Sequence, residues 1–116
     1  MELPLTTINT YPVELFKTDK IKTLVDNKRC FIILGEPSSS NLIDVDKIVG
    51  VVNELKEDKE DLIVDFNVLK TPMGTLFQTL FDNNAKIALR PCGVGQVDLN
   101  NNVTEYTLNY FWIDAA

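Results

Sequence analysis

The chain has 116 residues, of which 45% are hydrophobic and 24% are charged, and this size and composition indicate one globular domain over residues 1–116. No run approaches the roughly 18 apolar residues of a membrane-spanning helix, and the start lacks a basic segment followed by an apolar one, so we expect a protein made in the cytoplasm with no membrane partner. The net charge of −6 argues against a direct nucleic-acid partner, because affinity for phosphates comes largely from clustered lysine and arginine.

The sequence contains no histidine. Histidine is the usual general base near neutral pH, because its pKa of about 6.5 lets it accept and return a proton. Without histidine, hydrolysis by serine, cysteine or zinc loses its commonest base or ligand. The composition therefore favours a binding role over an enzymatic one, and we expect no cofactor.

The N-terminal part of the chain predicts a short extended segment at residues 3–8, followed by a helix. Pro12 suits the first turn of a helix, and from Val13 to Val25 the apolar residues recur with a loose helical period. We expect one amphipathic helix over this stretch.

A strand and a loop come next. Residues 30–34 are a continuous apolar run of strand length, which Gly35 stops. Residues 36–40 contain proline and three consecutive serines, which is typical of an exposed loop. The pattern predicts a buried strand that leads into this loop.

Two β-rich segments, residues 43–55 and 62–69, are joined by the charged residues 56–61. This arrangement predicts a long hairpin with a solvated tip. The acidic residues of the tip lack the alternating oxygen ligands and the glycine of a calcium-binding loop, so we favour a turn over a metal site.

A second helix is predicted after the hairpin. Thr71 is a suitable N-cap, Pro72 fits the first helical position, and the helix should end near Asn83 and Asn84. Apolar residues recur one turn apart within it, at Leu76, Phe77, Leu80 and Phe81.

The C-terminal part predicts two strands. The first begins at residues 87–89 and is punctuated by Gly93 and Gly95, and residues 98–102 have turn composition. The second covers residues 103–113, with one set of alternate residues on a common face: Tyr106, Leu108, Tyr110 and Trp112. The sum is an α+β fold, a small and mostly antiparallel β-barrel of about six strands with two helices.

Several side chains are candidates for chemistry or binding. Cys30 and Cys92 lie in apolar or strand-like settings and are expected to be reduced thiols rather than a disulfide. Arg90 is either an exposed strand arginine paired with an acid or an interface arginine, and we favour the interface. Tyr110 and Trp112 suit the core of a small barrel, with a docking patch as the alternative. Arg90, Tyr110 and Trp112 are therefore the candidate interaction residues.

Six local strings follow one another in an order that is known from a protein family. They include Leu-Gly-Glu-Pro at residues 34–37 and Thr-Pro-Met-Gly at residues 71–74, and the others cover residues 8–12, 43–52, 87–97 and 103–114. Together they resemble the prohead maturation proteases of tailed bacteriophages, whose fold is related to herpesvirus assemblin. Thr-Pro-Met-Gly is the most specific of these strings. The resemblance covers almost the whole chain.

The departures from this family fall on its active site. Arg90 and Pro91 stand where the family has paired serines that include the nucleophile, and Gly50 stands where it has a strand histidine. The loop histidine of the family is missing too, so no catalytic residue can be carried over.

The resemblance thus implies a catalytically inactive homologue. Such a protein would be a non-enzymatic structural component of a phage virion, an auxiliary or decoration protein of the capsid. It would be made in the host cytoplasm and would bind the major capsid protein or other virion proteins. The sequence leaves its oligomeric state open.

Two alternatives come from other functional classes. The first is a prohead-type peptidase with a non-standard nucleophile, either Cys92 or one of the serines at residues 38–40. The second is a phage-encoded inhibitor of a host protein, for which the net negative charge is mild support.

Overall fold

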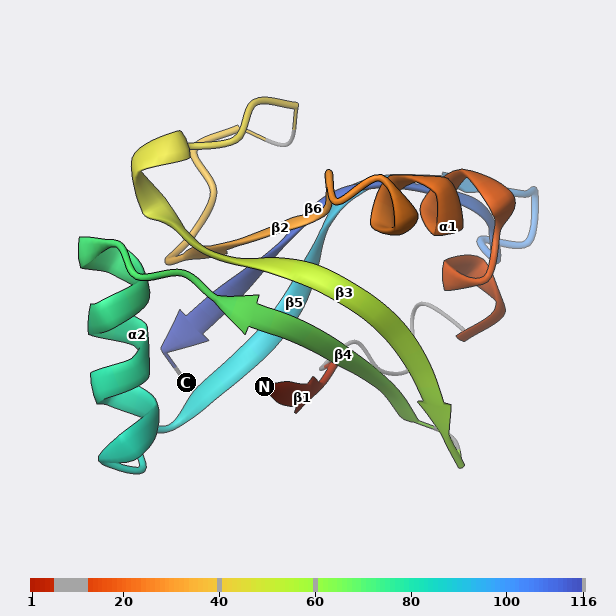
Figure 1. Cartoon of the computed structure of the whole chain (residues 1–116). Helices are drawn as coiled ribbons and strands as arrows, with labels where there is room; N and C mark the ends of the chain where they lie inside the picture. The colour runs from red at the N-terminus through yellow and green to blue at the C-terminus, as the bar shows by residue number, and fades with distance from the viewer. Residues whose placement is uncertain (6–12, 40, 60, 116) are drawn as a thin grey trace.

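A curled sheet forms the centre of the computed structural model, which describes residues 1–5, 13–39, 41–59 and 61–115 (Figure 1). Within those residues the strands lie in the order β1-β4-β3-β2-β6-β5, and all neighbours are antiparallel except the parallel pair β2 and β6. The six strands are β1 (Glu2–Pro4), β2 (Phe31–Leu34), β3 (Ile48–Asp58), β4 (Asp61–Val68), β5 (Ile87–Val97) and β6 (Val103–Ala115). The predicted α+β class is confirmed, with the sheet curled into a half-barrel.

The helix predicted over residues 12–25 is wrong as one continuous element. The described part forms a short 3-10 helix, η2 (Val13–Phe16), and then α1 (Asp19–Asp26). Thr18 is extended, and its side chain accepts a hydrogen bond from the backbone N–H of Ile21 at 3.4 Å. This N-cap satisfies a donor at the start of α1, so a new helix begins here with its own direction. Pro12 and the string at residues 8–12 lie outside the described residues.

The predicted strand and loop after α1 are confirmed, and so is the hairpin, although its limits differ. β3 starts at Ile48 rather than at residue 43, because Val45–Lys47 forms a 3-10 turn (η3). At the other end the ladder continues to the pair Asp58 and Asp61, so much of the charged stretch lies within the strands. Lys59, next to this pair, has a φ of +58°, as a tight turn requires.

The second helix is confirmed as α2 (Pro72–Asp82), with Pro72 in its first turn. The side-chain oxygen of Thr71 accepts a hydrogen bond from the N–H of Gly74 at 3.1 Å. A Cβ atom on Gly74 would stand 2.0 Å from the carbonyl oxygen of Leu69, so only glycine fits at this position. The helix ends at Asp82 with Asn83 as its C-cap, close to the predicted end.

The core lies on one face of the sheet, which we call the inner face. Phe77 of α2 packs against Phe66 of β4 with ring centroids 5.9 Å apart, and Phe16 of η2 packs against Tyr106 of β6 at 5.4 Å. Cys30 is fully buried there, and burial raises the pKa of its thiol to about 12. Other core residues are Ile21, Val25, Ile32, Val49, Val52, Leu62, Val64, Leu89, Leu108, Phe111 and Ile113. Cys30 and Cys92 are both free thiols, as expected.

The side-chain alternation along β6 changes at one point, which the sequence pattern did not predict. Cys92 pairs with Tyr110, but the next residue of β5 pairs with Leu108, so the register passes over Asn109. One added residue turns all later side chains to the opposite face. Phe111 therefore joins Leu108 in the core of the inner face, whereas Tyr110 is buried on the opposite face. The prediction that Tyr106, Leu108, Tyr110 and Trp112 share a face is wrong.

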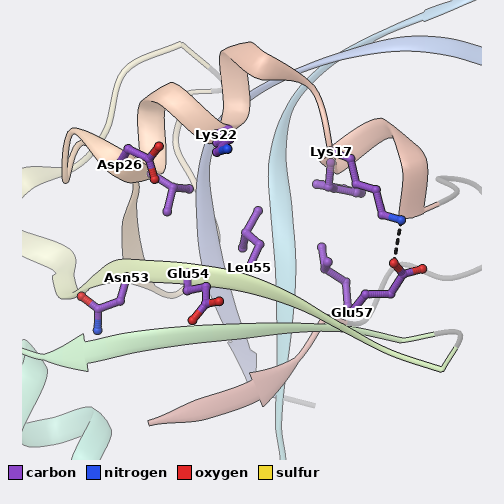
Figure 2. Close-up of a pocket in the computed structure, with 10 residues that line it drawn as sticks. Lys17, Lys22, Asp26, Asn53, Glu54, Leu55 and Glu57 are labelled. Carbon is purple, nitrogen blue, oxygen red and sulfur yellow. Dashed lines mark ion pairs between the residues drawn. The ribbon is translucent and has the colours of Figure 1, made fainter.

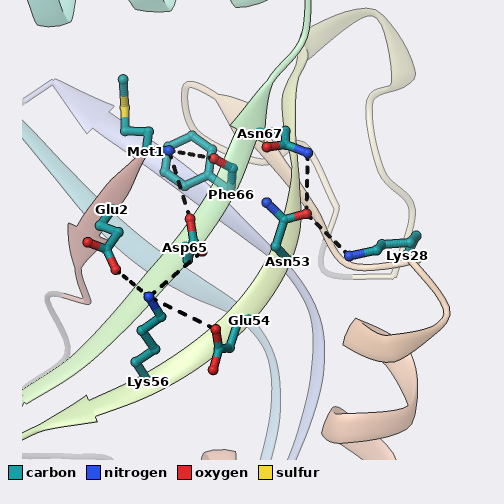
Figure 3. A network of polar contacts seen from close by, with 9 residues as sticks. All are labelled: Met1, Glu2, Lys28, Asn53, Glu54, Lys56, Asp65, Phe66 and Asn67. Atoms are coloured by element: carbon teal, nitrogen blue, oxygen red, sulfur yellow. Dashed lines mark hydrogen bonds and ion pairs between the residues drawn. The ribbon is translucent and has the colours of Figure 1, made fainter.

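Charged residues join the short strand β1 to its neighbours (Figure 3). The ammonium group of Lys56 lies 2.8 Å from Glu2 and 4.0 Å from each of Glu54 and Asp65. The hydrogen bond from Lys56 lowers the pKa of Glu2, and the same contact raises the pKa of Lys56. None of the helices in the described residues has the length and apolar character needed to span a membrane.

Candidate functional site

The positions at which the family resemblance places catalytic residues lie on one line across the sheet. Gly50 of β3 pairs with Ile32 of β2, and Ile32 pairs with Phe111 of β6. Phe111 in turn pairs with Pro91 of β5. The fold therefore aligns the position of the strand histidine with that of the paired serines, Arg90 and Pro91.

Gly50 has no room for a side chain. A Cβ atom added there would stand 2.7 Å from the carbonyl oxygen of Asn67 and 2.8 Å from a ring carbon of Phe66. The first contact is with the backbone of β4, and the second is with a fully buried ring. A histidine at residue 50 would therefore force β3 and β4 apart.

The other end of this line carries a charged pair. Arg90 donates a hydrogen bond from Nε to Oδ2 of Asp114 at 2.9 Å, and the two side chains are 39% and 34% exposed. The structure thus confirms the first reading of Arg90, a strand arginine paired with an acid. Trp112 pairs with Arg90 in the register and is partly exposed. An interface role for Arg90 and Trp112 stays a prediction.

Tyr110 lies on the face of β5 and β6 opposite the core, which we call the outer face. Its side chain is only 2% exposed, and its hydroxyl group donates a hydrogen bond to the carbonyl oxygen of Ser39. Burial raises the pKa of Tyr110, and the neighbouring thiol of Cys92 adds to this shift. A partner could reach Arg90 and Trp112 directly, but it could reach Tyr110 only through the chain that covers it.

The covering chain belongs to the segment between β2 and β3, of which the structure describes residues 35–39 and 41–47. The hydroxyl group of Ser38 donates to the carboxylate of Asp44 at 3.0–3.1 Å, and Ser39 Oγ accepts from two backbone N–H groups of the same segment. These bonds hold the loop in place while Leu42 and Val45 stay 73% and 72% exposed. The sequence analysis missed these two residues, although apolar side chains in a serine- and aspartate-rich loop were a visible signal.

The candidate nucleophiles of the peptidase alternative, Cys92 and the loop serines, lie in different surroundings. Cys92 is half-buried on the outer face and lies beside the hydroxyl group of Tyr110. Ser38 and Ser39 are engaged in the loop contacts. Neither arrangement supplies a base of the histidine type, since the chain has none.

Comparisons with known proteins bear on the fold. No family model matches the sequence, and no curated protein sequence matches it. The structure is similar to the solved structure of the bacteriophage T4 capsid assembly protease, with a TM-score of 0.62 and 17% sequence identity, over 97% of this chain and 75% of that chain. At this identity the similarity shows a shared fold. The chain therefore has a fold like that of a capsid assembly protease, as the resemblance of the sequence strings implied.

Proposed function

We propose that this protein is a non-enzymatic structural component of a tailed-phage head, an auxiliary or decoration protein that binds the major capsid protein or another virion protein. One observation carries the proposal. The protease-like fold is kept, yet Gly50 has no room for a side chain on the line that leads to Arg90 and Pro91.

The loss of chemistry supports a role in binding. In a serine protease, removal of the nucleophile or the base lowers turnover on the order of a millionfold. Here the positions of both are filled by residues that cannot replace them, and the sequence has no histidine at all. A scaffold that once recognised head proteins would keep its affinity for them without cutting.

The outer face supplies the groups for such binding. Tryptophan and arginine are enriched among residues that dominate the affinity of protein interfaces. Trp112 and Arg90 are both partly exposed on this face. Through the contact of Tyr110 with Ser39, the segment that carries exposed Leu42 and Val45 is fixed beside them.

The test is co-sedimentation of the purified protein with assembled capsids, followed by gel analysis of both proteins. We expect saturable binding with no cleavage, and at least tenfold weaker binding for Trp112→Ala. Leu76→Ala, which removes an exposed apolar residue of α2, is the matched control and should bind normally. Cleavage of the capsid protein would instead favour the alternative function, a peptidase with a non-standard nucleophile.

Mass spectrometry of purified virions gives a second, independent readout. An intact chain in fixed ratio to the capsid protein is the expected result for a structural component. If the chain is absent from mature virions, the decoration role is wrong and an inhibitor of a host protein becomes the better candidate.

A further inference from the structure

A groove of about 550 Å³ lies between α1 with η2 and strand β3 (Figure 2). Its floor is apolar and consists of Phe16, Val25 and Leu62 from the core and Leu55 from β3. Binding sites of this character occupy about 300–1,000 Å³. The groove is therefore large enough for about two or three apolar side chains.

The groove is a fixed feature, because its lower wall is held by a bulge in β3. The register between β3 and β4 shifts at Asn53. The side-chain oxygen of Asn53 accepts hydrogen bonds from Lys28 at 3.2 Å and from Asn67 at 3.3 Å (Figure 3). These contacts join the bulge to β4 and to the turn after α1, so both walls are tied to the same residue.

One end of the groove is crossed by an ion pair. Lys17 of the upper wall lies 2.6 Å from Glu57 of β3 (Figure 2). The two side chains are 48% and 44% exposed, and ion pairs at such exposure contribute little to stability. An incoming chain can therefore displace this contact at small cost.

The remaining charges on the rim are mostly negative. Glu54 is 61% exposed, and its nearest cation, Lys56, lies 4.0 Å away. Asp26 has no ion pair within 4 Å among the described residues, and Lys22 is the one further cation that they place on the groove. With a chain charge of −6, the rim therefore complements a cation on the occupant.

We propose that this groove docks a short segment of a partner protein in which two or three apolar side chains stand next to a lysine or arginine. The apolar side chains cover Leu55 and Val25, and the cation lies between Asp26 and Glu54. This site is distinct from the outer face, so the inference does not depend on capsid binding or on the absence of catalysis.

The test is selection from a displayed library of random heptapeptides on the folded protein, with counter-selection on Leu55→Trp, which fills the groove. We expect enriched peptides with apolar pairs flanked by lysine or arginine, whose affinity falls at least tenfold on Leu55→Trp. The inference is overturned if no enriched peptide loses affinity on that variant, or if the enriched peptides carry aspartate or glutamate instead.

Charge reversal keeps the test independent of the packing of Leu55. On Glu54→Lys, a selected basic peptide should bind at least fivefold more weakly by fluorescence polarisation, and its glutamate counterpart should bind better. Glu105→Lys makes the same charge change at an exposed position of β6 and should leave both affinities unchanged. An equal loss on both variants would mean that net charge, not the rim, guides binding. If peptides bind the groove but the protein does not co-sediment with capsids, the proposed function is refuted and the groove proposal stands.

Discussion

Gly50 lies so close to β4 that an added Cβ atom would stand 2.7 Å from the carbonyl oxygen of Asn67. We predict that Gly50→Ala lowers the free energy of unfolding by about 1–3 kcal/mol, the usual cost of overpacking a core, and that Gly50→His lowers it further. Urea denaturation followed by circular dichroism measures both. Unchanged stability of Gly50→His would show that β3 and β4 can separate here after all.

The same contact predicts the outcome of an attempt to restore the protease. The triple variant Gly50→His with Arg90→Ser and Pro91→Ser contains the residue types of the family at the strand-histidine position and at both serine positions. We expect it to be destabilised and to leave capsid protein uncut, because the histidine cannot take its place on the sheet without moving β4. Overnight incubation with capsid protein and gel analysis is the assay, and specific cleavage would contradict the claim that residue 50 has no room for a histidine.

Tyr110 links the outer face to the loop between β2 and β3 by its hydrogen bond to Ser39. Tyr110→Phe keeps the ring and removes this bond, so we predict a loss of about 0.5–1.5 kcal/mol in the free energy of unfolding. The loop should also be cut faster by added protease. Trp112→Phe, a change in a partly exposed ring of the same strand, should leave the rate of loop cleavage unchanged.

The elements that the sequence predicted well are those whose signals are local. Thr71 and Pro72 define the start of α2 as the N-cap and the first-turn proline, and the structure has both of them in these roles. The hairpin of β3 and β4 likewise follows from two β-rich segments and a polar tip.

Two features that the sequence did not predict depend on contacts between distant parts of the chain. Asn109 is recognised as an added residue in β6 only from the pairing with β5. The consecutive residues Cys92 and Gly93 of β5 pair with Tyr110 and Leu108, so the register passes over Asn109 between them. A period of two along one strand cannot reveal this shift, so Tyr110, which is indeed buried, was wrongly placed on the same face as Tyr106 and Leu108. The groove below α1 was not foreseen either, because it needs α1 and β3 to be placed side by side.

The start of α2 offers a test of capping. The Thr71 side chain accepts a hydrogen bond from the N–H of Gly74 at 3.1 Å. Thr71→Ala leaves that donor without its acceptor, and we predict a loss of about 1 kcal/mol in the free energy of unfolding. Thr71→Ser keeps the hydroxyl group and should stay close to the wild type. Equal losses for both variants would indicate that the methyl group, not the cap, stabilises the helix.

Cys30 predicts a particular dependence of stability on pH. Burial raises the pKa of its thiol from 9.0 to about 12 in the folded state. Below pH 9 the thiol is protonated in the folded and in the unfolded state, so its full contribution to the free energy of unfolding is present. Between pH 9 and 12 the unfolded chain loses this proton before the folded protein does. The free energy of unfolding should therefore fall with rising pH in this window, by up to about 1.4 kcal/mol per pH unit from this group. Cys30→Ala should show a shallower fall than Cys92→Ala, and identical slopes for the two variants would refute the assignment to Cys30.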